Sequence, residues 1–320
     1  MSTTDFSSSW QPSASLETLK QRSLLLRRIR QFFETRSVME VDTPHWSRFG
    51  VTDVHLENLR ITDGGFLLTS PEYPMKRLLA AGSGDIFQLG HVFRRDESGP
   101  RHNLEFTMLE WYRVGWDDER LMVEVAELCR SVADEPELAV ETVSYREAFE
   151  RSGLPDPHRA EVALLRACVG KQLNTEAGDW SRDECLDALM ALVVEPGLPG
   201  DRLVFVTRYP ASQAALARHE VVDGVTVGRR FEVYWRGMEL ANGYWELTDP
   251  AEQARRFEAD RARRRELGLA EPEVDPNLLA AMEAGLPECA GVALGVDRLL
   301  MIALGASDIS EVLPFDASRA

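Results

Sequence analysis

Residues 85–113 have the sequence DIFQLGHVFRRDESGPRHNLEFTMLEWYR, and they contain the clearest structural pattern in the chain. Residues 86–93 are apolar and rich in β-formers, whereas residues 105–113 alternate large apolar side chains with polar ones. This alternation is typical of a strand with one face on a core and the other in a cleft. Because a polar loop containing Gly and Pro separates the two segments, they are predicted to form a long antiparallel hairpin.

Cationic side chains crowd the loop of this predicted hairpin. Arg94, Arg95, Arg101 and His102 lie in or beside it, and Phe106 follows shortly after. A guanidinium group pairs bidentately with phosphate, and aromatic rings stack on bases, so this composition suits a nucleotide. A charged, solvent-exposed hairpin without a ligand is an equally good interpretation of these residues alone.

The length and the charge of the chain limit its function. With 320 residues it can form one large domain or two smaller ones, and either would bury a substantial core. Its net charge of −17 favours a small cationic substrate or a basic protein partner over a nucleic acid, because phosphate backbones require a basic surface. We therefore expect no tRNA partner.

The sequence pattern also bears on the compartment. No apolar run approaches the ~20 residues that span a bilayer. The N-terminal segment, MSTTDFSSSWQPSAS, lacks the basic region and the apolar core of a secretory signal. The four cysteines are far apart and form no C-x-x-C pair, which argues against a disulfide framework or a metal cluster. A cytoplasmic protein without membrane association is expected.

A single domain is predicted for residues 16–320. Residues 1–15 are polar and Ser-rich and are expected to be a frayed, disordered tail. Residues 16–36 have apolar side chains at helical spacing and are predicted to form an amphipathic helix. Residues 141 to about 200 contain several short helical patterns, which are interpreted as a helical insertion without chemistry of its own.

Two glutamates in the segment GMELANGYWEL are candidate metal ligands. Glu239 and Glu246 are seven residues apart, which would place them on opposite faces of a regular strand. A bulge or turn at Asn242–Gly243 could bring them together. Two converged carboxylates suit Mg²⁺ bound to phosphate oxygens, although two surface acids on an edge strand fit the spacing equally well.

Two further segments combine a turn with a functional side chain. In the segment from Gly291 to Arg298, glycines would let the backbone approach a ligand, and Arg298 falls in the first turn of a helix. In TSPE, Glu72 is held in a turn before another helix. Each segment alone is also compatible with an ordinary turn or a helix N-terminus.

Taken together, the segments resemble the catalytic domain of the class II aminoacyl-tRNA synthetases, nearest to the lysyl-specific branch. They are FRRDE at 93–97, HNLEFTMLEWY at 102–112, MELANGYWELTD at 238–249 and GVALGVDRL at 291–299. VMEVDTP at 38–44 is similar to the first motif of that class, which forms its dimer. The resemblance implies an α+β fold, with an antiparallel β-sheet flanked by helices, in a homodimer.

Two features depart from the lysyl-tRNA synthetases. Those enzymes carry an anticodon-binding β-barrel ahead of this domain, whereas here only the short segment 1–15 precedes the first predicted helix. Their G-x-G-x-G turn has Ala293 at its middle position in this chain. Both features, with WQPSAS at 10–15 and SPEY at 70–73, resemble the bacterial elongation factor P lysine ligases, paralogues that attach β-lysine or lysine to a lysine side chain of that translation factor. A smaller departure is Asp96, which stands where a Glu is usual beside Arg94, with Arg95 in place of a common Asn.

The resemblance implies residues for each step of an adenylate-forming reaction. Arg94 would hold the α-phosphate, Phe106 and Arg298 would sandwich adenine, and Glu239 with Glu246 would hold Mg²⁺. The residues expected to bind ATP are Arg94, Arg95, Asp96, His102, Asn103, Phe106, Glu239, Leu240, Gly295 and Arg298. The residues expected to bind the amino acid are Ser70, Pro71, Glu72, Glu110, Tyr112, Asn242, Glu246 and Ala293.

The positions of the glutamates in these segments indicate a substrate with two ammonium groups. Glu72 is assigned to the amine nearest the substrate carboxylate, and Glu110 with Tyr112 to the far ammonium group. The extra methyl of Ala293 is expected to disfavour α-lysine and to suit an amine on the β-carbon.

The expected function is an ATP- and Mg²⁺-dependent ligase that activates β-lysine or lysine and transfers it to elongation factor P. One alternative is a stand-alone lysyl-adenylate-forming ligase with another acceptor. The other is a non-catalytic paralogue that binds an amino acid or nucleotide and regulates a partner.

Overall fold

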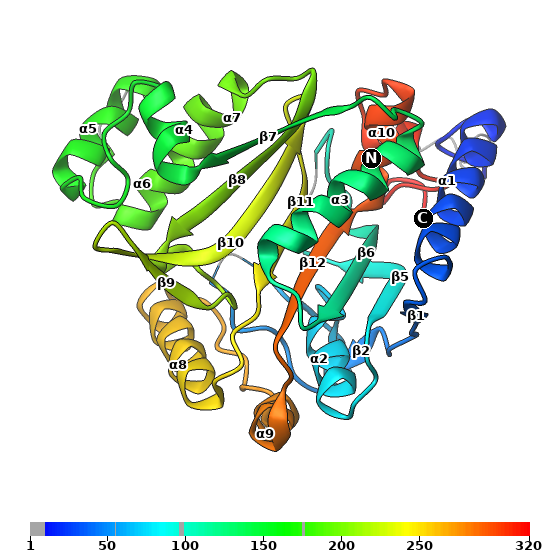
Figure 1. Cartoon of the computed structure of the whole chain (residues 1–320), viewed down its shortest axis with the longest axis horizontal. Coiled ribbons are helices and arrows are strands. Elements are labelled where there is room, and N and C mark those ends of the chain that lie inside the picture. The colour runs from blue at the N-terminus through cyan, green and yellow to red at the C-terminus, as the bar shows by residue number, and fades with distance from the viewer. Residues whose placement is uncertain (1–9, 55, 96–98, 175–176) are drawn as a thin grey trace, which may run out of the picture.

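The predicted hairpin forms the centre of a large sheet in the computed structural model, which describes residues 10–54, 56–95, 99–174 and 177–320. Strand β5 (Ile86–Phe93) pairs antiparallel with β6 (Glu105–Val114), so the hairpin prediction is confirmed. The sheet runs in the order β1-β5-β6-β12-β11-β10-β8-β7, with β9 paired to β10 (Figure 1). The further strands of this sheet are β1 (Met39–Glu40), β7 (Ala139–Ser144), β8 (Arg202–Pro210), β9 (His219–Val222), β10 (Val225–Trp235), β11 (Met238–Trp245) and β12 (Cys289–Gly295).

The predicted α+β class is confirmed, and the sheet is mixed at its edges. The central pairings are antiparallel, whereas β1 is parallel to β5 and β7 is parallel to β8. A small separate sheet has the order β2-β4-β3, from β2 (Trp46–Ser47), β3 (Leu59–Arg60) and β4 (Phe66–Leu67). The position of β1 at the sheet edge agrees with Pro44 closing its segment, because proline cannot continue a central strand.

Three helices cover one face of the sheet: α1 (Leu16–Glu34), α3 (Asp118–Ala133) and α10 (Val296–Leu304). The first of them begins at its N-cap Ser15, whose hydroxyl accepts a hydrogen bond from the backbone N–H of Thr18 at 3.0 Å. Alternation along β6 places Leu109 and Trp111 in the core under these helices. The intervening residues of β6 therefore point to the opposite face.

Two groups of helices pack around the rest of the sheet, one at its β7–β8 end and one along one end of its strands. At the β7–β8 end lie α4 (Tyr145–Arg151), α5 (Val162–Leu173), α6 (Arg182–Leu189), η1 (Met190–Val194) and α7 (Glu195–Gly197) (Figure 1). Along the ends of the strands that carry Ile86, Tyr112 and Cys289 lie α2 (Glu72–Ala80), α8 (Pro250–Glu266) and α9 (Pro276–Gly285), at the bottom of Figure 1. The shorter elements η2 (Ala211–Gln213) and η3 (Ile309–Glu311) complete the chain.

The predicted helical insertion at 141–200 contains these five short helical elements, and it also begins inside a strand. Residues 139–144 form β7, which extends the sheet by pairing with β8. That pairing joins residues 139–144 to residues 202–207, across all the intervening helices, so no local pattern could reveal it.

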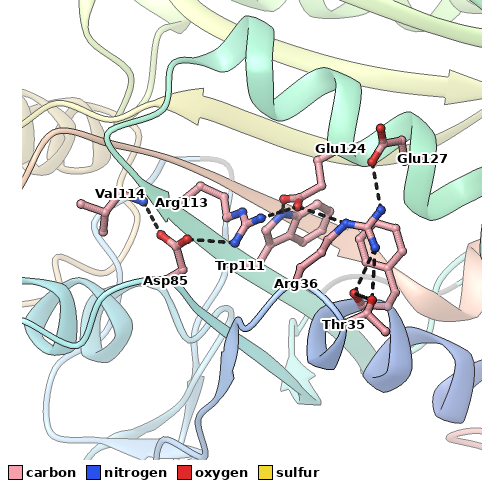
Figure 2. Close-up of polar contacts among 9 residues, drawn as sticks. Thr35, Arg36, Asp85, Trp111, Arg113, Val114, Glu124 and Glu127 are labelled. Carbon is pink, nitrogen blue, oxygen red and sulfur yellow. Dashed lines mark hydrogen bonds and ion pairs between the residues drawn. The ribbon is translucent and has the colours of Figure 1, made fainter.

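A buried polar network ties the end of β6 to α1 and α3 (Figure 2). The guanidinium of Arg113 donates to Glu124 and to Asp85, both at 2.8 Å. The indole N–H of Trp111 donates to the other oxygen of Glu124 at 3.0 Å, and Arg36 lies 3.7 Å from the same carboxylate. Burial raises the pKa of Glu124, and Arg113 acts against that rise. The network is therefore expected to be sensitive to the removal of one partner.

The expected disordered tail is corrected in its last residues. Residues 1–9 lie outside the described part of the chain, but Ser13 and Ala14 donate backbone hydrogen bonds to the carbonyls of Pro314 and Leu313, at 2.8 and 3.0 Å. Ala14 is buried. The two ends of the described chain therefore pack together. Among the described residues, no helix combines the length and apolar character needed to cross a membrane.

Candidate active site

Strand register lines up four polar or small residues on the open face of the sheet. Glu110 of β6 pairs with Ala293 of β12, which pairs with Asn242 of β11, which pairs with Glu232 of β10. Residues directly opposite one another in a sheet point to the same side. Three of these four residues were predicted to bind the amino acid, and the register places them side by side.

A cleft lies on this face, at the start of β6 and the end of β12. It is lined by Arg94, Arg101, His102, Asn103, Phe106, Met108, Glu239, Leu240, Ala241, Asn242, Ala293, Gly295, Asp297, Arg298 and Ile309. Most of the residues predicted to bind ATP and two predicted to bind the amino acid are among them. The hairpin loop, the end of β12 and the start of α10 thus meet around one cavity.

Cations and an aromatic ring dominate this cleft. Arg298 donates to the carbonyl of Glu239 at 3.0 Å and contacts the His102 ring at 2.5 Å. The guanidinium carbon of Arg94 lies 5.3 Å from the centre of the Phe106 ring. The cleft therefore offers two guanidinium groups for phosphate and a flat ring for a base.

Two other predicted ATP residues have defined positions. The side chain of Asn103 makes its hydrogen bonds within the protein: its NH₂ group donates to the carbonyl of Glu105 at 2.7 Å, and its carbonyl oxygen accepts from the N–H of Ala317 at 3.0 Å. At Gly295, an added Cβ would meet only the Arg298 side chain, at 3.7 Å or more, so the protein itself does not require glycine there. A Cβ at this position would instead project into the space beside Arg298.

A β-bulge turns Glu239 into the cleft. Val233 of β10 pairs with Ala241, whereas Tyr234 pairs with Glu239, which leaves Leu240 without a partner in the register. The extra residue reverses the alternation, so Glu239 shares a face with Asn242. The predicted bulge is thus present, but at Leu240 rather than at Asn242–Gly243.

The bulge does not bring the two candidate metal ligands into contact. Glu239 lies 3.5 Å from Arg298, whereas Glu246 follows the far end of β11, on the order of 20 Å along an extended strand. Glu246 pairs instead with Lys76 and is not among the residues that line the cleft. Desolvation, with Glu232 nearby, raises the pKa of Glu239 to about 7, while Arg298 acts to lower it. The predicted convergence of both glutamates is therefore corrected for this structure.

The fit to Mg²⁺ rests on Glu239. In the described part of the chain, no group of three or more His, Cys, Asp or Glu side chains is placed to hold a metal. Mg²⁺ commonly takes one or two carboxylates and completes its shell with substrate phosphates. Glu239 beside Arg298 fits that pattern, whereas the carboxylate of Glu246 is buried against a lysine.

Glu246 belongs to a second cluster of acids, beyond the cleft at the N-terminus of α2. Lys76 lies 2.5 Å from Glu72 and 2.7 Å from Glu246, and its side chain is only 2% exposed. Burial raises the pKa of Glu246 to about 7, with Lys76 opposing that rise and Glu72 adding to it. Nothing in the sequence singles out Lys76, because a lysine four residues after a glutamate is ordinary on a surface helix.

Glu110 joins the two regions. It accepts hydrogen bonds from Ser70 at 2.6 Å and from Tyr112 at 2.7 Å. Burial and then Glu72 raise the pKa of Glu110 to about 8. The hydroxyl of Ser70 also accepts from the N–H of Glu72 at 3.0 Å, across Pro71, which caps the helix. The predicted amino-acid residues Ser70, Pro71, Glu72, Glu110 and Tyr112 therefore form one connected group.

A buried ion pair supports the cleft from behind. Arg22 of α1 donates to Asp297 at 2.5 Å and to the hydroxyl of Thr107 at 2.6 Å. The other oxygen of Asp297 accepts from the backbone N–H of Thr107 at 2.7 Å. Thr107 follows Phe106 in the chain and Asp297 precedes Arg298, so this contact sets the spacing between the ring and the guanidinium.

Two further residues, Arg95 and Asp96, were predicted to bind ATP, and Arg95 is not among the residues that line the cleft. Asp96 lies outside the described residues, and Arg95 is exposed. The cleft also contains Met108 and Ile309, which sequence reasoning missed. Met108 is signalled by the alternation of β6, whereas Ile309 comes from the C-terminal segment, and no sequence pattern connects it to the hairpin.

Comparison with known proteins places this site in a family. A family model for tRNA synthetases class II (D, K and N) matches residues 9–319. The chain belongs to that family. It is 50% identical over 323 residues to the elongation factor P–(R)-β-lysine ligase of Edwardsiella ictaluri (strain 93-146), with 98% of each chain covered. It is 49% identical over 321 residues to the enzyme of the same name from Pasteurella multocida (strain Pm70), with 97% of this chain and 98% of the other covered.

Membership of the class II synthetase family agrees with the geometry. The described residues of the four sequence segments that resembled that family lie on or beside β5–β6, β11 and the β12–α10 turn, and each segment contributes residues to the cleft or to the acid cluster.

Proposed function

We propose that this protein is an ATP-dependent ligase that activates β-lysine or lysine as an aminoacyl-adenylate and transfers it to a lysine side chain of elongation factor P. The main support is that a cleft and a cluster of acids adjoin on one face of the sheet. A cleft with Arg94, Phe106 and Arg298 adjoins an acid cluster with Glu72 and Glu110, in a chain about half identical to such ligases over its whole length.

The first step is adenylation. An oxygen of the amino-acid carboxylate bonds to the α-phosphorus of ATP, and the bond from that phosphorus to the pyrophosphate oxygen breaks. Such a reaction depends on alignment and charge neutralisation. Arg94 holds the α-phosphate and the attacking carboxylate, because its guanidinium lines the cleft between the hairpin loop and the start of α2.

The adenine lies against Phe106, with Arg298 on its other side. Arg298 is already oriented by the carbonyl of Glu239 and by His102, so it needs little rearrangement on binding. Gly295 leaves room for the nucleotide beside Arg298. The backbone at Asn103 is held in place by the hydrogen bond from the Asn103 side chain to the carbonyl of Glu105. Mg²⁺, held by Glu239 together with the phosphates, would neutralise phosphate charge.

The acid cluster selects a diamino acid. Glu72 takes the amine nearest the substrate carboxylate, and Glu110, oriented by Tyr112 and Ser70, takes the far ammonium group. Asn242 has its carbonyl oxygen turned to Arg230 at 3.2 Å, which leaves its NH₂ group available for an acceptor on the substrate. Hydrogen bonds to charged groups of this kind contribute about 1.5–3 kcal/mol each.

The second step is aminolysis of the adenylate. The neutral amine of the acceptor lysine bonds to the carbonyl carbon, the carbon–oxygen bond to AMP breaks, and the amine loses a proton as the amide forms. The net charge of −17 favours a basic region around the acceptor and makes association sensitive to salt.

We place the enzyme in the cytoplasm as a homodimer. The dimer is supported by β1 at the sheet edge and by the exposed apolar side chains of Met39 and Trp46, which are 48% and 49% exposed. Met39 lies on that edge strand and Trp46 on the small neighbouring sheet, and exposed apolar side chains of this size are candidates for an interface.

Intact-mass analysis of elongation factor P after incubation with enzyme, ATP, Mg²⁺ and lysine or β-lysine tests the proposal. The expected result is the addition of one lysyl group, lost in Arg298→Met and retained in Lys20→Met, which removes an exposed cation from α1. Lysine-dependent ATP–pyrophosphate exchange without modification of the factor would indicate a ligase with another acceptor. No exchange at all would indicate a non-catalytic paralogue.

A further inference from the structure

Lys76 is a buried cation within the amino-acid pocket. It lies one helical turn after Glu72 on α2, among the apolar side chains of Met75 and Leu79, and it is 2% exposed. An ammonium group is rarely buried in this way unless it is paired. Burial acts to lower the pKa of Lys76, but Glu246 and Glu72 together raise it above its ordinary value, so the group is charged.

The charges of the pocket can be counted from its contacts. Glu72 and Glu246 share Lys76, and Glu110 lies on the other side of Ser70. The two ammonium groups of a bound diamino acid favour the ionised forms of Glu110 and Glu246, whose pKa values burial raises to about 8 and about 7. With that substrate bound, three ionised carboxylates and the ammonium of Lys76 leave two negative charges.

The neighbouring charged groups do not change this count. Arg218, which acts on Glu246 from the segment before β9, forms an ion pair with Glu288. Tyr112 has its pKa raised by burial and stays neutral, and so does the buried thiol of Cys289 on β12.

We propose that Lys76 is a resident counter-ion that holds the pocket at two negative charges, the complement of the two ammonium groups of a diamino acid. This inference rests on the proposed function for the identity of the substrate. Without Lys76, the carboxylates of Glu72 and Glu246 would face each other inside the protein, which is strongly unfavourable.

A counter-ion role and a packing role for Lys76 predict opposite effects of Lys76→Met on lysine binding when Glu246 is already replaced by Gln. Glu246→Gln leaves one negative charge in the pocket, and adding Lys76→Met to it restores two. If charge is the main contribution, the second substitution improves lysine binding in that background. If Lys76 mainly fills space and orients its neighbours, a further lost contact weakens binding again.

The test is the dissociation constant of lysine and of β-lysine, measured by calorimetry on the full chain. Glu246→Gln is expected to raise it about tenfold or more. The double variant Lys76→Met/Glu246→Gln is expected to bind about threefold or more tightly than Glu246→Gln. The same pair of measurements is made with Glu72→Gln in place of Glu246→Gln, and Lys20→Met serves as the control for loss of a distant cation. Lys76→Met/Glu246→Gln removes both charges of the buried Lys76–Glu246 pair, so this double variant is expected to fold. Lys76→Met/Glu72→Gln leaves the buried carboxylate of Glu246 without its lysine and is expected to be less stable. Thermal unfolding checks that both are folded at the temperature of the binding measurement.

Each outcome has a distinct meaning. Equal or weaker binding by both double variants overturns the role of Lys76, even if the wild type shows lysine-dependent ATP–pyrophosphate exchange. The expected order of affinities without exchange in the wild type supports the role of Lys76 and contradicts the proposed activity. A wild type that binds no diamino acid overturns both.

Discussion

Arg22→Met is expected to weaken ATP binding although Arg22 lies on a helix outside the cleft. The substitution keeps an unbranched side chain but removes the guanidinium that donates to Asp297 at 2.5 Å and to Thr107 at 2.6 Å. Asp297 is 2% exposed, so its carboxylate would remain buried with the N–H of Thr107 as its hydrogen-bond donor in this contact. Leaving one partner of a buried ion pair typically costs about 3–5 kcal/mol.

This cost can be converted into a melting temperature. For a chain of 320 residues the entropy of unfolding is about 0.7 kcal/mol per kelvin. Arg22→Met should therefore lower Tm by about 4–7 °C at fixed protein concentration. Because Thr107 and Asp297 adjoin Phe106 and Arg298, the KM for ATP in pyrophosphate exchange should rise by the order of tenfold. The KM for lysine should change little.

A double-mutant cycle separates the ion pair from other effects of the substitution. Asp297→Asn removes the negative charge and can still accept from the N–H of Thr107. The variant Arg22→Met/Asp297→Asn should recover most of the lost Tm, because neither charge is then left alone. Arg27→Met, an exposed position on the same helix, should behave as the wild type. Strictly additive losses in the double variant, or an unchanged KM for ATP in Arg22→Met, would refute the reasoning.

Three further predictions concern the amino-acid pocket. Gly291→Ala would place a Cβ 2.3 Å from the Tyr112 ring, so the KM for lysine should rise about tenfold. Gly197→Ala is the control, because a Cβ there has no neighbour within 4 Å, and it should leave the exchange kinetics unchanged. Ala293→Gly should shift the ratio of kcat/KM for β-lysine over α-lysine towards α-lysine, and an unchanged ratio would remove Ala293 from the specificity argument. Because burial raises the pKa of Glu110 to about 8 and the ionised form binds ammonium, kcat/KM for lysine should increase with pH up to about 8 and level off above it. In a pH profile measured between about 6.5 and 9, Glu110→Gln should remove the part of that increase centred near pH 8 and leave the part that Glu246 contributes near pH 7.

The sequence predicted those parts of the site that depend on local periodicity. Alternation along residues 105–113 was sufficient to place Glu110 and Tyr112 on the cleft face and Leu109 on the core face. A period of two residues is a strong signal because a shift of one residue exposes the whole apolar set.

The features that sequence reasoning missed depend on contacts between distant segments. Lys76 and Arg22 look like ordinary surface cations on amphipathic helices, and each becomes a buried partner only when β11 or α10 packs against it. Strand β7 is stabilised by a parallel neighbour, β8, that follows it only after a long helical segment. Glu239 and Glu246 were expected to share one Mg²⁺ site. In the structure β11 stays extended and holds the two glutamates at its opposite ends.

The bulge at Leu240 connects these observations to function. In a regular strand Glu239 would point with Ala241 towards the core, whereas the extra residue places it on the face that carries Asn242. The strand then continues regularly to Glu246, so that one strand delivers a carboxylate to each end of the same face. The end with Glu239 faces Arg298, where phosphate charge must be balanced. The end with Glu246 faces Lys76, where amine charge must be matched, and the strand between them sets the separation of the two pockets.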